Sequence, residues 1–251
     1  MISVALCGCN GKMGHVLTSC INNQEDMRVV VGFDINTEPF ADFPIFSTPA
    51  ECDIKADILI DFSHPSSLSG ILTYAKKISI PVILATTGYS KEDEELIKSA
   101  SQVIPVFFSA NMSLGISLLA ALAKKAASIL GEGYDVEIVE KHHNLKVDAP
   151  SGTALMLGNA ISEGLPYNPV FVYDRHSVRK KREKTEIGFS SIRGGTIVGE
   201  HDILFCGHDE TITLSHTAQS KELLANGAIS AARFMVGKPA GYYTMNELIE
   251  Q

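Results

Sequence analysis

Short apolar runs alternate with amphipathic segments through the first hundred residues of the chain. Each run has the length of a buried strand, and the runs are Ile2–Cys7, Arg28–Phe33, Ile58–Asp61, Pro81–Ala85 and Pro105–Phe108. The segments between them have the apolar spacing of helices: Met13–Asn22, Ser67–Ile78 and Lys91–Ala100. Strands that alternate with helices predict an α/β fold with a doubly wound parallel sheet covered on both faces.

The pattern changes near residue 112. A long helix is predicted over Leu114–Leu130 and a strand over Asp135–Val139. Three later runs have the alternation of antiparallel strands: Ile187–Ile192, Asp202–Phe205 and Thr211–Ser215. A last helix over Lys221–Val236 closes the chain. We therefore expect residues 1–112 and 218–251 to form one domain, and residues 113–217 to form an inserted α+β domain with a mixed or antiparallel sheet.

Composition narrows the class of protein. The chain has 251 residues, 45% of them hydrophobic and 20% charged, so it can bury a sizeable core and is not a candidate for disorder. Its formal net charge of −8 argues against a protein that coats nucleic acid. An anionic ligand must therefore be held by a local concentration of positive charge.

Cysteine usage and apolar run lengths point to the cytoplasm. The five cysteines are odd in number and sparse, which fits free thiols in a reducing compartment better than a disulfide framework. No basic region precedes the apolar start of the chain, so we expect no signal peptide. The longest apolar stretch, Leu114–Leu130, is interrupted by Lys124 and Lys125, and we expect it to fall short of a membrane span.

The first strand runs directly into a glycine-rich turn, Gly8-Cys9-Asn10-Gly11-Lys12-Met13-Gly14, which a helix follows. Glycines allow the backbone to approach a pyrophosphate, whose charge then lies at the helix N-terminus. The second strand ends at Asp34, twenty residues beyond Gly14, where a carboxylate can accept bonds from ribose hydroxyls. An ordinary glycine turn is the alternative, and Lys12 is either a phosphate ligand or a solvated lysine.

Three further strand ends carry small polar residues: Asp61–Pro65, Ala85–Gly88 and Ser109–Met112. Ligands of open α/β sheets lie at the carboxyl ends of the strands, so these loops should border the nicotinamide half of a dinucleotide. Each loop alone is consistent with plain turn chemistry. Together, in register, they favour a dinucleotide site.

The densest chemistry lies in residues 140–154, where a strand delivers the adjacent His142 and His143, with Lys146 soon after. Imidazole is the usual proton donor near neutral pH. Ser151 is expected to cap a helix whose first backbone N–H groups, at Gly152 and Thr153, are free to bind a carboxylate. The alternative is a pair of partnered surface histidines. A metal site is not expected, because neighbouring strand residues point to opposite faces.

The segment E-x-H-H-x-x-K-x-D-A-P-S-G-T-A resembles the signature of the 4-hydroxy-tetrahydrodipicolinate reductase family, also called dihydrodipicolinate reductase. The resemblance extends along the chain through Gly8–Gly14, Ser191–Gly195, Val198–His201 and Ala225–Ala228. It implies a Rossmann-type domain completed by the last helix, a second domain that binds substrate and forms a homotetramer, and the reduction of 4-hydroxy-tetrahydrodipicolinate to tetrahydrodipicolinate by NADH or NADPH. This reaction belongs to lysine and diaminopimelate biosynthesis, and its substrate is a small cyclic dicarboxylate.

The resemblance also implies roles for individual residues. His142 would be the proton donor and acceptor, Lys146 a second proton donor, and His143, Gly152 and Thr153 substrate ligands. The nucleotide would be held by the following residues: Gly8, Cys9, Asn10, Gly11, Lys12, Met13, Asp34, Ala85, Thr86, Thr87, Ser109, Ala110, Asn111 and Met112.

Two departures from the family pattern stand out. Family members that use both cofactors often have an arginine directly after the acidic residue that binds the ribose. This chain has Ile35 at that position, which favours NADH or at most the use of both cofactors. Arg175–Lys184 is unusually basic and is either a solvated loop or an attractor for a dicarboxylate. Two rival functions remain: a nucleotide-binding scaffold without turnover, which should lack His142 or Lys146, and a dehydrogenase of another small acid.

Overall fold

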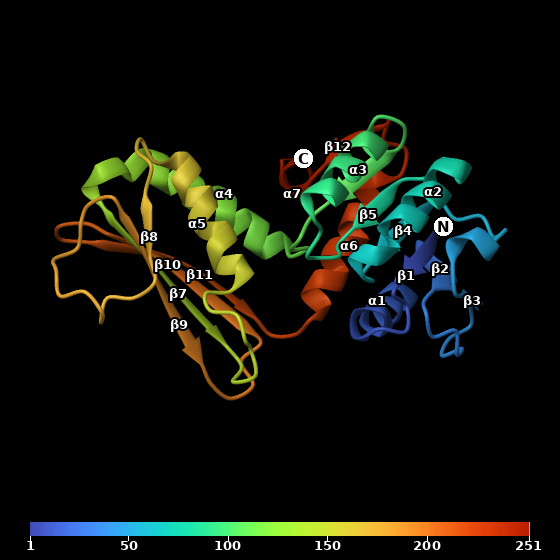
Figure 1. Ribbon diagram of the computed structural model, residues 1–251, viewed down its shortest axis with the longest axis horizontal. Helices are drawn as coiled ribbons and strands as arrows, with labels where there is room; N and C mark the ends of the chain where they lie inside the picture. Colours follow the sequence, from blue (N-terminus) through green and yellow to red (C-terminus); the bar gives the residue numbers. More distant parts are fainter. Residues whose placement is uncertain (251) are drawn as a thin grey trace. The chain divides into compact units, whose positions relative to one another are not determined.

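A computed structural model describes residues 1–250 of the chain. Contacts divide it into two compact units (Figure 1). The first combines Met1–Leu114 with the segment from Lys221 onward, and the second is Gly115–Ser220. The sequence pattern predicts the two domain boundaries between residues 112 and 113 and between residues 217 and 218, close to these positions.

The first unit contains a seven-stranded sheet in the order β12-β6-β5-β4-β1-β2-β3. Every neighbouring pair in it is parallel. Its strands are β1 (Ile2–Cys7), β2 (Met27–Phe33), β3 (Ile45–Phe46), β4 (Ile58–Asp61), β5 (Val82–Leu84), β6 (Pro105–Phe108) and β12 (Gly241–Tyr243). The parallel α/β sheet is thus confirmed. The short strands β3 and β12 escape sequence prediction because two or three residues show no periodicity.

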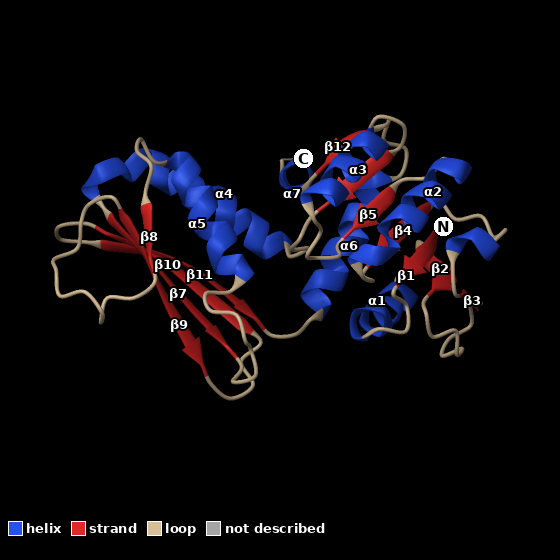
Figure 2. Ribbon diagram, in the orientation of Figure 1, coloured by secondary structure: helices blue, strands red, loops and turns tan. Residues whose placement is uncertain are grey.

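Helices cover both faces of this sheet (Figure 2). Alternate strand residues enter different cores: Leu6 packs in the cluster that includes residues of α1 (Lys12–Asn22) and α6 (Glu222–Met235). Ala5 packs in the cluster that includes residues of α2 (Leu68–Ile78) and α3 (Lys91–Ser101). The C-terminal helix α6 therefore completes one face of the N-terminal sheet. A short helix, α7 (Met245–Ile249), adds Met245 to the first cluster.

The second unit contains a five-stranded sheet in the order β11-β10-β7-β9-β8. Its strands are β7 (Asp135–His142), β8 (Val170–Val172), β9 (Glu186–Arg193), β10 (Gly199–Cys206) and β11 (Thr211–Ala218). The antiparallel expectation is correct for β10 with β11 and with β7. It is wrong for the run at 187–192, because β9 pairs in parallel with β7 and β8. The chain between β7 and β9 contains a helix, which gives the crossover that a parallel pair requires.

Two helices, α4 (Leu114–Leu130) and α5 (Gly152–Gly164), cover one face of the second sheet (Figures 1 and 2). Their buried residues, among them Ala123 and Leu157, pack against Ile138 and Ile203 of the sheet. The helical stretch from Leu114 continues through a short turn to Gly133, which makes it long and apolar enough to cross a membrane by length and composition. The expectation that it falls short of a span is corrected on that criterion. Here its apolar side instead forms the core of the unit.

Candidate functional site

The glycine turn after β1 is sterically required. Gly8 has a φ of +75°, and a Cβ there would lie 2.6 Å from the carbonyl oxygen of Phe62. A Cβ on Gly14 would lie 2.3 Å from the carbonyl oxygens of both Gly8 and Cys9. Any side chain at these positions would push the turn away from β4 or from the start of α1. The sequence keeps glycine where the backbone folds most tightly.

The turn leads to a helix end suited to an anion. Gly11 precedes α1 and offers no side-chain cap, and the first turn of α1 contains no acidic residue. The uncancelled helix dipole at this end therefore favours a negative ligand such as a pyrophosphate. Lys12 is exposed at the first helical position. The residues present thus fit a dinucleotide.

Asp34 connects the glycine turn to the loop after β2. Its carboxylate accepts the backbone N–H groups of Asn10 at 2.9 Å and of Asn36 at 3.1 Å. The Asn10 side chain donates in turn to the carbonyl oxygens of Asn36 at 2.6 Å and Glu38 at 3.0 Å. The carboxylate is therefore fixed beside the turn, as a ribose-binding acid must be. Between these anchored residues, the side chain of Ile35 is 98% exposed.

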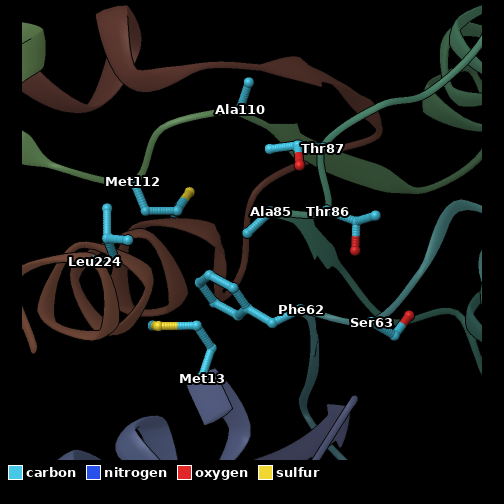
Figure 3. A pocket seen from close by; sticks show the side chains of 9 residues that line it. All are labelled: Met13, Phe62, Ser63, Ala85, Thr86, Thr87, Ala110, Met112 and Leu224. Atoms are coloured by element: carbon cyan, nitrogen blue, oxygen red, sulfur yellow. The ribbon is translucent and has the colours of Figure 1, made fainter. Parts of the chain in front are cut away.

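A cavity of about 250 Å³ lies at the carboxyl ends of β4, β5 and β6 (Figure 3). It brings together predicted residues from three loops: Met13, Ala85, Thr86, Thr87, Ala110 and Met112. Phe62 and Ser63 also line it and come from the loop Asp61–Pro65, which was expected to border the nicotinamide. Leu224 lines it too and was not expected there. Figure 3 shows the ring of Phe62 near Met13 and Ala85, and Leu224 of α6 beside Met112.

Close packing explains why α6 contributes to this cavity. A Cβ on Gly227 would lie 1.6 Å from the carbonyl oxygen of Met112, so only glycine lets the helix reach the loop after β6. The segment Ala225–Ala228 resembles the family pattern, but its sequence does not indicate a contact with Met112. Such contacts between distant segments depend on the fold.

Asp61, at the end of β4, joins the loops around the cavity. It is fully buried and accepts hydrogen bonds from Ser63 Oγ at 2.5 Å, Thr86 Oγ1 at 2.8 Å and Tyr89 Oη at 3.1 Å. Burial raises the pKa of Asp61, and these hydrogen bonds oppose the rise. The carboxylate orients two of the loops that the sequence placed near the nicotinamide.

In the second unit, β7 carries a buried pair formed by Glu140 and His142. His142 Nδ1 lies 2.5 Å from Glu140 Oε2. The guanidinium of Arg193, from β9, donates a hydrogen bond to each oxygen of the same carboxylate, at 2.8 Å and 2.7 Å. Burial alone raises the pKa of Glu140, but hydrogen bonds from Arg193, Ser191 and His142 outweigh it and lower the pKa to about 2. Glu140 is therefore an anion at any working pH.

His201 of β10 packs against His142. Their ring centroids lie 5.3 Å apart at 76°, an edge-to-face contact. His201 Nε2 lies 3.1 Å from Ser151 Oγ, and Ser151 Oγ accepts the N–H of Ala154. Ser151 therefore caps α5, as its position in the sequence predicts. Burial, followed by the charge of His142, lowers the pKa of His201 to about 4, so this ring is neutral near pH 7.

Lys146 and Asp148 form an ion pair in the loop between β7 and α5. Lys146 Nζ lies 2.8 Å from Asp148 Oδ1. Hydrogen bonds from Lys146 and from the Gly152 N–H lower the pKa of Asp148. The binding of a carboxylate by the backbone N–H groups of Gly152 and Thr153 stays a prediction. His143 Nδ1 is buried and has no hydrogen-bond partner within residues 1–250.

The basic segment at 175–184 has a structural role that neither sequence interpretation anticipated. Arg175 bonds Glu137 and Glu186, both at 2.6 Å. Arg182 bonds Asp135 at 2.9 Å and the carbonyl oxygen of Val136 at 3.0 Å. These arginines tie the segment to the ends of β7 and β9.

Sequence reasoning missed the partners of His142 rather than His142 itself. Glu140, Arg193 and His201 all lie in motifs quoted for the resemblance, but without assigned roles. Arg193 is 53 residues from Glu140 and meets it only because β7 and β9 are neighbours. An acidic residue two positions before a strand histidine, and so on the same face, is the one signal that could have identified Glu140.

Together these features define a class of protein. A doubly wound parallel sheet with this glycine turn binds a dinucleotide, and a second unit with a buried carboxylate–histidine pair suits proton transfer to a small substrate. The chain is a two-domain oxidoreductase that uses a pyridine nucleotide.

Comparisons with known proteins identify the family. The family models named dihydrodipicolinate reductase, N-terminus, and dihydrodipicolinate reductase, C-terminus, match residues 2–112 and 115–249. The 4-hydroxy-tetrahydrodipicolinate reductases of Clostridium novyi (strain NT) and Caldanaerobacter subterraneus subsp. tengcongensis are each 49% identical, over 100% of this chain and 99% of theirs. A dipicolinate-bound dihydrodipicolinate reductase from Paenisporosarcina sp. TG-14 shares the fold, with a TM-score of 0.83, 24% identity and coverage of 98% and 99%.

The chain belongs to the 4-hydroxy-tetrahydrodipicolinate reductase family, as the sequence resemblance indicated. It reduces 4-hydroxy-tetrahydrodipicolinate to tetrahydrodipicolinate with a pyridine nucleotide, a step in lysine and diaminopimelate biosynthesis.

Proposed function

We propose that His142 is the proton donor of this reduction and that Lys146 is the second proton donor. The observation that carries the proposal is the buried contact of 2.5 Å between His142 Nδ1 and Glu140 Oε2. A carboxylate in this position holds the imidazole ring in one orientation, and imidazole is the side chain best suited to supply the proton that the reaction consumes. His142 is only 9% exposed, so bulk water has little access to the ring.

The reaction takes up one hydride and one proton and releases one water. When bound, the nicotinamide supplies the hydride. His142 then protonates the ring position on which electron density accumulates. The ammonium of Lys146 lies beside that developing negative charge, where a fixed cation stabilises the transition state most strongly. Its protons make it available as a second donor.

The substrate's carboxylates are held, in this proposal, at the start of α5 and by His143. Gly152 and Thr153 are the first two residues of the helix, whose dipole favours an anion. The buried Nδ1 of His143, which lacks a hydrogen-bond partner in the described chain, supplies a further polar atom. Dipicolinate, the ligand of the Paenisporosarcina relative, is a cyclic dicarboxylate of the same kind.

The nucleotide occupies the first unit, with NADH preferred or both cofactors accepted. Its pyrophosphate lies at the glycine turn, Gly8 to Met13, and its ribose at Asp34. Its nicotinamide lies against Ala85 to Thr87 and Ser109 to Met112, at the cavity below the strand ends. Asp34 repels a 2′-phosphate and the exposed Ile35 offers no counter-charge, which supports the preference for NADH.

The assembly, we propose, is a homotetramer formed through the second sheet. Helices α4 and α5 cover one face of that sheet, and the other face presents Val139, Leu204 and the 46% exposed Ile192. A second copy would cover this partly apolar face. Light scattering at micromolar concentration should give the mass of four chains, and a monomer mass would overturn this part. The free thiols of all five cysteines support a cytoplasmic location.

The activity is tested by following NADH oxidation with the condensation product of pyruvate and aspartate semialdehyde. We expect oxidation with this product and none with pyruvate or with other small acids. Oxidation with a different acid would favour the rival dehydrogenase. No oxidation with any substrate, at saturating nucleotide, would favour a binding protein without turnover.

A further inference from the structure

We propose that Glu140, Arg193 and Gly199 are positioning residues that make Nε2 the atom through which His142 exchanges its proton. The inference rests on the proposed role of His142 and deepens it. It concerns residues that do not themselves contact the substrate. Each acts on a different part of the imidazole ring or its partner.

The first step is the state of the carboxylate. Glu140 is 1% exposed, and its two oxygens accept four hydrogen bonds besides any from Ser191: two from Arg193, one from Ser151 N–H at 3.2 Å and one from His142 Nδ1. The bidentate contact with Arg193 keeps Glu140 ionised, as the lowered pKa of Glu140 indicates. An ionised carboxylate only accepts hydrogen bonds. Nδ1 of His142 must therefore donate to it and keep its hydrogen.

The second step follows from the two nitrogens of imidazole. Because Nδ1 retains its hydrogen in both protonation states, Nε2 is the nitrogen that gains and loses the proton. The neutral ring is thus fixed as one tautomer.

The third step is the space around Nε2. A Cβ on Gly199 would lie 3.1 Å from His142 Nε2, tighter than nine in ten real Cβ contacts, so the ring would have to shift by a few tenths of an ångström. Gly199 is extended strand backbone, so glycine is not required there by its conformation. A side chain at this position would crowd Nε2. The glycine keeps that nitrogen accessible.

Other charges near the ring do not compete for Nδ1. His201 contacts the ring edge-to-face and is neutral near pH 7, with its Nε2 engaged by Ser151. Lys146 and His216 contribute electrostatic repulsion to His201, and Lys146 is paired with Asp148. Arg193 also donates to the carbonyl oxygen of Asp148 at 2.6 Å, which fixes the guanidinium from a second side.

The first experiment measures the tautomer directly. In the ligand-free full-length chain, ¹⁵N NMR of the imidazoles, with His142 assigned by loss of its signals in His142→Gln, should show a protonated Nδ1 and an unprotonated Nε2 at alkaline pH. In Glu140→Gln this preference should be lost. The opposite tautomer in the wild type would overturn the proposal. This readout does not depend on whether His142 is the proton donor, so it separates this inference from the proposed function.

The second experiment uses kinetics. Glu140→Gln should lower kcat about tenfold or more, with KM for NADH unchanged and the Nδ1-protonated tautomer of His142 lost. Arg193→Lys keeps the charge, and should give a smaller loss of kcat. Glu163→Gln, on the exposed end of α5, is the matched control and should match the wild type. Wild-type kcat in folded Glu140→Gln would contradict the proposal.

Gly199→Ala tests access to Nε2 without changing any charge. It should lower kcat at every pH and leave the shape of the pH profile and the Nδ1-protonated tautomer as in the wild type. Gly133→Ala, where a Cβ would meet nothing within 4 Å, is the matched control. Wild-type kcat in Gly199→Ala would overturn the role of Gly199.

Discussion

The ammonium of Lys146 lies 2.8 Å from the carboxylate of Asp148. Asp148 precedes Gly152, the first residue of α5, by four positions. An internal carboxylate therefore engages one of the groups that we propose for the reaction. A bound dicarboxylate must compete with Asp148 for it.

Asp148→Asn should therefore tighten the binding of dipicolinate to the enzyme. The side chain of Asp148 is 57% exposed, so its ion pair is screened by water and the gain should be about two- to fivefold in Kd. Isothermal titration calorimetry on the wild type and the variant checks this. Asp209→Asn, on an exposed loop, should leave Kd unchanged. Weaker binding in Asp148→Asn would show that Asp148 holds Lys146 in place for the ligand instead of competing with it.

Thr153→Val should chiefly raise the KM for the dicarboxylate. In our proposal its hydroxyl donates to a substrate carboxylate, and a hydrogen bond to a charged group contributes about 1.5–3 kcal/mol, which corresponds to a KM about tenfold higher or more. Steady-state kinetics should show kcat within about a factor of three. Thr73→Val, whose hydroxyl bonds Ser69 on the surface of α2, is the control. A KM equal to that of the wild type would remove Thr153 from the site.

Ile35→Arg should move cofactor preference toward NADPH. Ile35, next to Asp34, offers no cation to a 2′-phosphate, and its 98% exposed side chain leaves room for one. The ratio of kcat/KM for NADPH to that for NADH should rise by about tenfold, equivalent to about 1.4 kcal/mol. A wild-type enzyme that already prefers NADPH by more than about tenfold would contradict our account of cofactor choice.

His201 should make the stability of the enzyme fall with acid. Its pKa is about 4 in the folded chain and 6.5 ordinarily, so the unfolded chain binds the proton more readily. Its contribution is fully present above pH 6.5 and is lost as the pH falls toward 4. The shift corresponds to roughly 3 kcal/mol. Urea unfolding between pH 4 and 7 should show this loss in the wild type and a shallower one in His201→Gln. Equal slopes would refute the assignment.

Local pattern was enough to predict most of the first sheet. Buried runs such as Ile58–Asp61 are strands over those same residues, and the last helix joins the N-terminal unit as expected. The parallel pairing of β9 with β7 could not be predicted in this way, because alternation along a strand says nothing of its neighbour's direction. Non-local pairing also decides which residues surround His142.

Sequence likewise identified chemical groups better than their partners. His142, Lys146 and Ser151 stand in one motif, and the structure keeps them in one unit. Glu140 owes its low pKa to Arg193, which belongs to another strand. The ion pair between Lys146 and Asp148 depends on a loop conformation that no periodicity describes.

The most direct test of the account is kcat of His142→Gln with the condensation product of pyruvate and aspartate semialdehyde. Glutamine keeps a polar side chain of similar size but cannot carry the proton. We expect kcat to fall about hundredfold or more, while the Kd for NADH, measured by fluorescence titration, stays as in the wild type. His208→Gln, on an exposed loop, should be fully active. Near-normal kcat in His142→Gln, with NADH binding intact, would contradict the account and assign the proton to Lys146 or to water.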